Sequence, residues 1–175
     1  RSHSKLSADI AEGHIGGARV TLLKPTTFIN DSGRALGAVL RYFKIEPSDL
    51  FVFYDELDLA PGKLRVRFAG GTAGHNGLRD IGSRFAGDFR RVRIGIGHPG
   101  HRDDVMGYVL NDFAKSDAAW LTPLIDAVTD AAPLLAMGDD PGFMSKIALI
   151  MNPPLQKPPH ATDDVPESEC SRDTE

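Results

Sequence analysis

With 175 residues, of which 41% are hydrophobic and 25% charged, the chain has the size and composition of a single globular domain. No apolar run approaches the ~20 residues that a membrane-spanning helix needs, and the amino end lacks the basic-then-apolar pattern of a secretory signal. The single cysteine, Cys170, excludes an internal disulfide and favours a reducing compartment, so we expect a cytoplasmic protein that does not enter membranes.

The formal net charge of −4 is concentrated at the carboxyl end of the chain. From Asn152 onward six acidic residues stand against two basic ones, so this segment alone carries −4 and residues 1–151 are balanced. The segment also holds five prolines and almost no apolar residue after Leu155. We therefore expect a folded domain over residues 1–151 and a disordered, acidic, proline-rich tail over residues 152–175. The tail is either a solvated appendage, the commoner case, or a competitor of RNA for basic surfaces.

Apolar spacing predicts alternating strands and helices along the domain. Strands are expected at residues 18–23, 50–54, 63–68 and 92–96. Helices are expected from Asp31 or Ser32 to Phe43, after Asn76, at 118–137 (kinked or ended by Pro133) and at 143–151, with a short element at 106–110. Strict alternation at 63–68 predicts that Leu64, Val66 and Phe68 point inward. Strands mixed with helices indicate a single α/β domain whose twisted, mixed, mostly parallel sheet has helices on both faces.

Two loops within 25 residues carry the polar side chains of a candidate site. Asp55 and Glu56 directly follow the apolar strand at 50–54, and a small-residue loop at 69–74 ends in His75 and Asn76 as a helix begins. In open α/β sheets, ligands bind outside the carboxyl ends of the strands, in loops that a rigid scaffold supports. These two loops therefore predict a binding or catalytic site.

Five segments of the chain occur in a recognisable order: KPTTFINDSG at 24–33, DELDL at 55–59, GHNGLRD at 74–80, RVRIGIGHP at 91–99 and GYVL at 107–110. This succession closely resembles the bacterial peptidyl-tRNA hydrolase family, from about Arg19 to about Ile150. The resemblance implies a monomeric hydrolase that cleaves the ester between a peptide and the 3′-terminal ribose of tRNA. It implies neither a metal nor an organic cofactor.

The opening of the chain departs from that family. The family begins with a strand, a Gly-Asn-Pro-Gly turn and a Thr-Arg-His-Asn segment, whose histidine is thought to activate water. Neither motif occurs here, and His3 and His14 lack the surrounding residues that would transfer the role to them. We therefore expect a truncated or mis-started chain with little activity of its own, since a positioned general base contributes about 10²–10⁴ in rate.

The resemblance assigns catalytic roles to three side chains. Asp55 would orient the water-activating imidazole, and Asn30 and Asn76 would position water and substrate. Taken without the resemblance, Asp55 would simply cap a turn, and Asn30 and Asn76 would be polar residues at helix starts. His75 lies at the end of the second loop of the site and could be taken for the general base, but the resemblance implies that its equivalent in the family is not the base. We expect His75 to help build the loop.

Three further residues are assigned to tRNA binding. Phe28 would stack on the terminal adenine, unless it is an ordinary core phenylalanine. Arg67 and Arg93 match positions that the family uses near tRNA phosphate. Lys63 and Arg65 lie on the same strand face as Arg67, and charge that protects an edge strand explains them equally well.

Other function classes find little support in the sequence. A metal site built from Asp55, Asp58, His75 and His98 lacks the spacing of known ligand motifs. The glycine-rich loop at 70–74 is not followed by the Gly-Lys-Ser/Thr of a nucleotide-triphosphate site, and no Gly-x-Ser-x-Gly supports a serine esterase. One alternative stays open: a catalytically impaired RNA-binding protein on the same fold.

Overall fold

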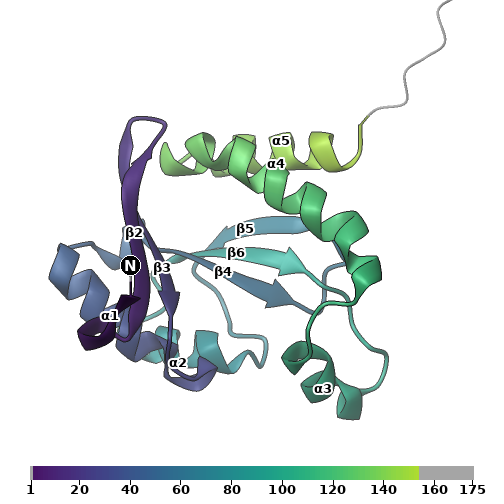
Figure 1. The fold of residues 1–175 in the computed structure, drawn as a ribbon, viewed down its shortest axis with the longest axis horizontal. Helices are drawn as coiled ribbons and strands as arrows, with labels where there is room; N and C mark the ends of the chain where they lie inside the picture. The colour runs from purple at the N-terminus through teal and green to yellow at the C-terminus, as the bar shows by residue number, and fades with distance from the viewer. Residues whose placement is uncertain (1, 154–175) are drawn as a thin grey trace, which may run out of the picture.

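The computed structural model describes residues 2–153, which form two three-stranded sheets and the helices packed around them (Figure 1). One sheet has the order β1-β2-β3, with β1 at Ser2–His3, β2 at Ala8–Ile15 and β3 at Ala18–Pro25. The other has the order β4-β6-β5, with β4 at Phe51–Glu56, β5 at Leu64–Phe68 and β6 at Arg90–Gly95. The expected disordered tail lies outside the described residues from position 154 onward.

Strand direction in these sheets is mixed. β4 and β6 pair in parallel, with Asp55 opposite Ile94, whereas β5 pairs with β6 antiparallel. The β1–β2 and β2–β3 pairings are also antiparallel. The predicted α/β class with a mixed sheet is confirmed, but the mostly parallel character holds only for the β4–β6 pair among residues 2–153. A direct hairpin joins β2 and β3, as is usual for antiparallel neighbours, whereas β5 and β6 are antiparallel although α2 lies between them in the chain.

Helices occupy nearly the expected places. They are α1 at Ser32–Phe43, α2 at Asn76–Phe85, α3 at Val105–Leu110, α4 at Ala118–Ala136 and α5 at Asp140–Met151. In α1 the predicted apolar face is buried, with Ala35 at 1% and Val39 at 2% exposure. The side chain of Asp31, at the N-cap of α1, makes no capping bond; it pairs instead with Arg34 at 2.7 Å.

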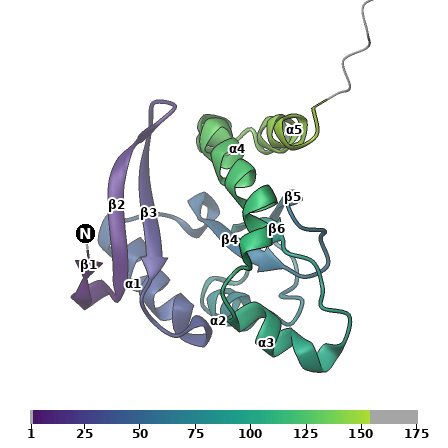
Figure 2. The ribbon, with the colours of Figure 1, turned by 45° about the vertical axis from the view of Figure 1, so that its right-hand side comes forward.

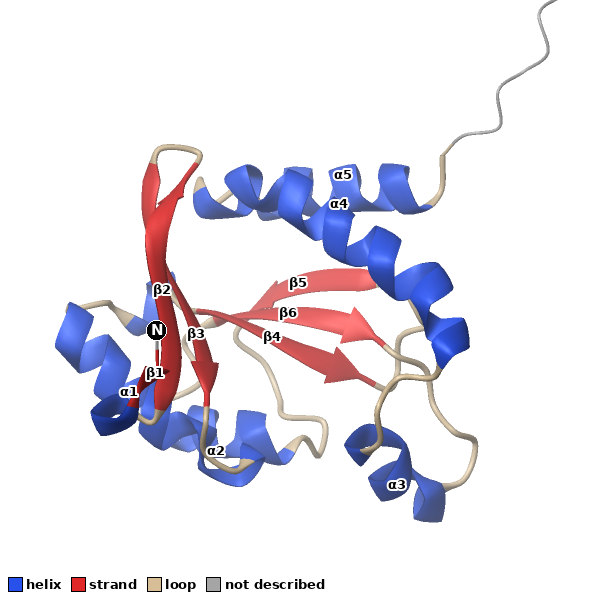
Figure 3. Ribbon diagram, viewed as in Figure 1, coloured by secondary structure: helices blue, strands red, loops and turns tan. Residues whose placement is uncertain are grey.

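The β4-β6-β5 sheet is covered by helices on both faces, as predicted (Figure 3). Leu64, Val66 and Val92 pack against α4 and α5 in the larger core cluster. On the opposite face, Val52 and Tyr54 of β4 pack against a cluster that α1 and α2 supply. The sheet is therefore fixed between two apolar layers, which holds the ends of its strands in place.

Three local features differ from the sequence predictions. β2 was not predicted, and it forms a hairpin with β3 whose tip lies near one end of α4 (Figure 2). A Cβ atom on Gly16 in that tip would lie only 3.1 Å from Pro133 Cβ.

The helix α4 continues through Pro133 to Ala136 rather than ending there. Phe68, predicted to point inward, is 55% exposed, and Arg90 covers its ring at 5.8 Å.

None of the helices within residues 2–153 combines the length and the apolarity needed to span a bilayer.

Candidate active site

Asn30 and Asn76 line the same open hollow, which has a volume of about 470 Å³. Asn30 lies in the short 3₁₀ turn Ile29–Asp31 that leads into α1, and Asn76 is the first residue of α2. Three residues of α2 complete the lining: Arg79, Asp80 and Ser83. The structure thus brings together two amides that are 46 positions apart in the sequence.

Asp55 does not line this hollow; it bonds to His75, the residue that precedes Asn76. Its Oδ1 atom lies 3.2 Å from His75 Nε2. The other ring nitrogen, Nδ1, accepts the backbone N–H of Leu78 at 3.2 Å and so caps α2. Because Nδ1 accepts a hydrogen bond, the ring proton belongs on Nε2, which donates it to Asp55.

His75 builds the loop, as predicted. Both of its ring nitrogens are engaged, so the ring has no free lone pair with which to take a proton from water. The imidazole side chain is only 17% exposed, whereas the Asp55 side chain is 37% exposed. Oδ2 of Asp55 has no side-chain partner among residues 2–153, so Asp55 retains an oxygen with which to bind a second donor.

The bond from His75 lowers the pKa of the Asp55 carboxyl, although partial burial acts in the opposite direction. A carboxyl whose pKa is depressed by folding stabilises the protein above its unfolded pKa of about 3.9, and this contribution is lost as the pH falls through the folded pKa. We therefore expect the stability difference between the native protein and an Asp55→Asn variant to shrink below about pH 4. Urea unfolding at a series of pH values measures this stability difference. A difference that stays constant down to pH 2 would contradict the claim that the His75 bond lowers the pKa of Asp55.

Close backbone contacts fix the two loops of the site. A Cβ atom on Gly77 would lie 3.0 Å from His75 Cε1 and 3.1 Å from Ile29 Cγ1, so the first turn of α2 lies directly on the turn that carries Asn30. After Asp55 the chain folds over Gly95 at the end of β6, where a Cβ atom would collide with the carbonyl of Ala60. Glycine at these two positions allows the loops to approach this closely.

Arg93 is held beside the site by a buried acid. Its Nε atom donates to Glu56 Oε2 at 2.8 Å, and Glu56 is 4% exposed. The Tyr54 hydroxyl donates to the same Glu56 oxygen at 3.3 Å. Burial together with the Glu56 charge raises the pKa of Tyr54, so the phenol stays protonated and able to donate.

Four arginines share one face of the β5–β6 pair. Arg65 lies opposite Arg93 and Arg67 lies opposite Arg91, so that like charges face each other across the two strands. Such facing pairs are destabilising in the absence of a counter-ion. Within residues 2–153, Glu56 is the one acid in an ion pair with any of the four. Arg91 is 3% exposed, its Nε and Nη1 have no hydrogen-bond partner there, and burial lowers its pKa.

Phe28 is 86% exposed at the entrance to the turn that carries Asn30. The alternative of an ordinary core phenylalanine is therefore wrong. Its neighbour Ile29 is also 52% exposed. Together they form an exposed apolar surface directly before Asn30 in the chain.

Sequence reasoning missed Arg79, Asp80 and Ser83, which line the hollow with the two amides. Asn76, Arg79, Asp80 and Ser83 stand at i, i+3, i+4 and i+7 and thus share one face of α2. That spacing is a signal visible in the sequence alone.

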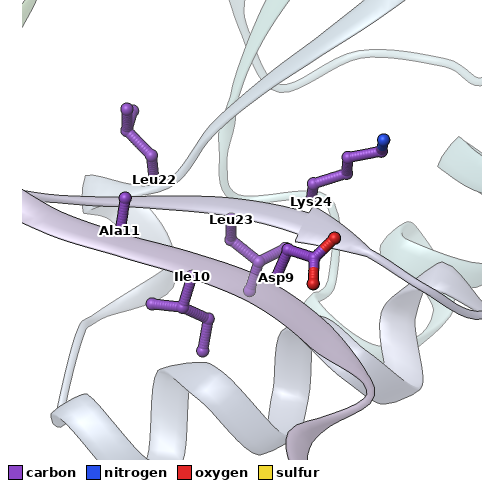
Figure 4. A pocket seen from close by; sticks show the side chains of 6 residues that line it. All are labelled: Asp9, Ile10, Ala11, Leu22, Leu23 and Lys24. Carbon is purple, nitrogen blue, oxygen red and sulfur yellow. The ribbon is translucent and has the colours of Figure 1, made fainter. Parts of the chain in front are cut away.

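A second hollow lies on the β2–β3 hairpin and is lined by Asp9, Ile10, Ala11, Leu22, Leu23 and Lys24 (Figure 4). Leu22 is 60% exposed and points away from Ile10, which is buried toward α1. This hollow holds no group of reactive side chains. Nor do residues 2–153 bring together three or more His, Cys, Asp or Glu side chains able to hold a metal ion.

Comparison with known proteins agrees with this geometry. A sequence model of the family described as Peptidyl-tRNA hydrolase matches residues 1–155. The chain is 52% identical to a Dinoroseobacter shibae protein named peptidyl-tRNA hydrolase, over 93% of this chain and 73% of that protein. It is 54% identical to the Parvibaculum lavamentivorans protein of that name, over 86% of this chain and 74% of the relative.

Solved structures give the same result. The crystal structure of peptidyl-tRNA hydrolase from Acinetobacter baumannii superposes with a TM-score of 0.78 at 36% sequence identity, over 84% of this chain and 75% of that one. The family model spans the hairpin, the site and the helices that support it. The chain therefore belongs to the peptidyl-tRNA hydrolase family.

Proposed function

We propose that the protein hydrolyses the ester bond between the peptide and the tRNA of peptidyl-tRNA, which releases free tRNA for recycling. The observation that carries the proposal is that Asn30 and Asn76 line one hollow, while Asp55 bonds to His75, the residue directly before Asn76. Nothing in the comparisons favours the alternative of an impaired RNA-binding protein.

In the proposed reaction, water adds to the ester carbonyl and the bond between that carbon and the ribose oxygen breaks. The ribose oxygen takes up one proton and becomes a hydroxyl, and the peptide leaves as a carboxylate with release of the other proton of the water. Asp55 uses Oδ1 for His75, and Oδ2 would be available to accept the ring N–H of a second, water-activating imidazole, which the motifs of this chain do not identify. The amides of Asn30 and Asn76 each donate and accept, so they orient water and stabilise the developing oxyanion. The exposed ring of Phe28 offers a face for the terminal adenine.

The test is release of an N-acetylated, radiolabelled amino acid from N-acetyl-aminoacyl-tRNA, measured as loss of acid-precipitable label. Aminoacyl-tRNA with a free amino group serves as the control substrate, and deacylated tRNA is titrated separately to measure binding. Turnover that spares the control substrate supports the hydrolase. Tight binding of tRNA without turnover would establish the RNA-binding alternative instead.

The arginines of β5 and β6 are proposed to contact tRNA phosphates through Arg67 and Arg93. Arg67 is exposed and without a carboxylate partner among the described residues, whereas Arg93 is oriented by Glu56. Each phosphate contact makes binding depend on salt but not on sequence.

Replacement of Arg67 by glutamine is expected to weaken tRNA binding and to reduce the slope of log K against log salt by roughly 0.7 to 0.9. Fluorescence anisotropy with labelled tRNA at several salt concentrations measures both quantities. Arg19→Gln is the control, because Arg19 is exposed but pairs with Glu12 on the distant hairpin. Equal slopes in the two variants would exclude Arg67 from the phosphate contacts.

We also propose that the protein acts as a monomer in the cytoplasm, as its family membership suggests. Sedimentation equilibrium at micromolar concentration tests the first statement, and cell fractionation tests the second.

A further inference from the structure

The first turn of α1 receives a capping bond from a different helix. The first N–H groups of a helix have no partner within the helix, and a side chain just before it commonly satisfies one of them. Here Asp31 occupies that place but pairs with Arg34. The N–H of Gly33 donates instead to Asp80 Oδ2 of α2, at 2.7 Å.

The contact between Gly33 and Asp80 is tight and specific. A Cβ atom on Gly33 would lie 2.7 Å from Arg84 Cδ and 2.9 Å from the Asp80 carbonyl oxygen, so no larger residue fits without a shift. Arg84 Nε donates to the other Asp80 oxygen at 3.3 Å, and the Asp80 side chain is only 17% exposed. A carboxylate at a helix N-terminus is also favoured by the helix dipole.

This contact joins the two segments that carry the amides. Asn30 precedes Gly33 by three residues and Asn76 precedes Asp80 by four, and Asp80 itself lines the hollow between the amides. A second contact between the two segments is that of Gly77 with Ile29. The two segments are thus joined by two glycine contacts and by an ion pair of Arg84 with Asp31 at 3.7 Å, and of the two glycine contacts only that of Gly33 includes a charge-assisted hydrogen bond.

We propose that Asp80 is a positioning residue, which holds Asn30 and Asn76 at the separation that ester hydrolysis requires. The inference rests on the proposed function and assigns to it a residue outside the set that the family resemblance supplied. A displacement of about 1 Å in a catalytic group costs on the order of 100-fold in rate. The loss of Asp80 should therefore lower kcat much more than it raises KM.

The experiment compares two ways of breaking the contact with a matched control. Asp80→Ala removes the acceptor, and Gly33→Ala blocks its approach while adding a residue that favours helix formation. Gly37→Ala is the control, because it places the same methyl group in the same helix, where its nearest neighbours are at 3.4 and 3.6 Å. We expect kcat to fall roughly 10- to 100-fold in the first two variants and to stay near the native value in the third.

Two further variants separate positioning from a general loss of stability. Asp80→Asn keeps an oxygen that can accept the Gly33 N–H, so it should recover most of the lost kcat. In an Asn30→Ala background, Asp80→Ala should cost far less than in the native background, because residues that act as a unit are not additive. Additive losses, or equal kcat in Asp80→Ala and Gly37→Ala, would overturn the proposal.

An NMR measurement that does not depend on catalytic activity tests the role of Asp80 independently of the proposed function. In ¹⁵N-labelled protein, Asp80→Ala should speed exchange of the Gly33 amide and shift the side-chain amide signals of both Asn30 and Asn76, while Gly37→Ala should leave them in place. If the native protein fails to hydrolyse the ester but these signals shift, the proposed function falls and the positioning contact stands. If the signals do not move, the contact plays no part in placing the amides.

Discussion

Replacement of Asp55 by asparagine is expected to reduce kcat for peptidyl-tRNA hydrolysis by about 10²- to 10⁴-fold. Asparagine has the shape of aspartate but carries no charge, so it does not stabilise an imidazolium that forms as water is activated. Its carbonyl oxygen can still accept the Nε2–H of His75, which lies 3.2 Å from Oδ1 of the native carboxylate, but the second oxygen is replaced by an NH2 group that cannot accept another N–H. The effect should therefore fall on kcat, with KM changed little.

The matched control for this change is Asp58→Asn, on the same loop. Asp58 is exposed, and its backbone N–H, not its side chain, bonds to Glu56 at 3.3 Å. We expect this variant to keep native kcat and a native melting temperature. If Asp58→Asn were as impaired as Asp55→Asn, the charge of the loop rather than the Asp55 carboxylate would be responsible.

Truncation of Phe143 to alanine should produce the largest loss of stability, about 3–5 kcal/mol. Phe143 of α5 is fully buried and packs in the cluster that joins α4 and α5 to the β4-β6-β5 sheet. Removing its ring leaves a cavity that these rigid elements fill only in part. Urea unfolding measures the change as a shift of the midpoint at constant slope.

Leu149→Ala provides the comparison for Phe143→Ala within the same helix. Leu149 is 60% exposed, so its truncation should change the free energy of unfolding by less than about 1 kcal/mol. Similar losses in the two variants would show that α5 does not dock on the sheet as described.

Secondary structure with a strong apolar period was predictable from the sequence, and irregular features were not. The helix α1 followed directly from its spacing, because Ala35 and Val39 have to face the core. The strand β2 was invisible, because Ala8–Ile15 mixes polar residues with a glycine and is exposed over much of its length. Its pairing with β3 and β1, together with the packing of Ala8 and Ile10 against Val39 of α1, holds it in extended form. Pro133 does not end α4, because packing of that helix against the sheet outweighs one missing hydrogen bond.

Candidate residues for the site could be proposed from the sequence, but the contacts between them could not. The motifs identify Asn30, Asp55 and Asn76, yet no pattern indicates that His75 donates to Asp55 while it caps α2. A histidine in that capping place is uncommon, because serine, threonine, aspartate and asparagine are preferred. The Gly33–Asp80 bond joins residues 47 positions apart and appears only once the two helices are packed.

The facing arginines of β5 and β6 have a practical consequence for handling the protein. With a net charge of −4 the chain should elute from an anion exchanger like an ordinary acidic protein. Its local basic face should nevertheless retain cellular RNA through cell lysis at low ionic strength. A preparation washed in dilute buffer will thus show excess absorbance at 260 nm, and a wash with concentrated salt will remove it.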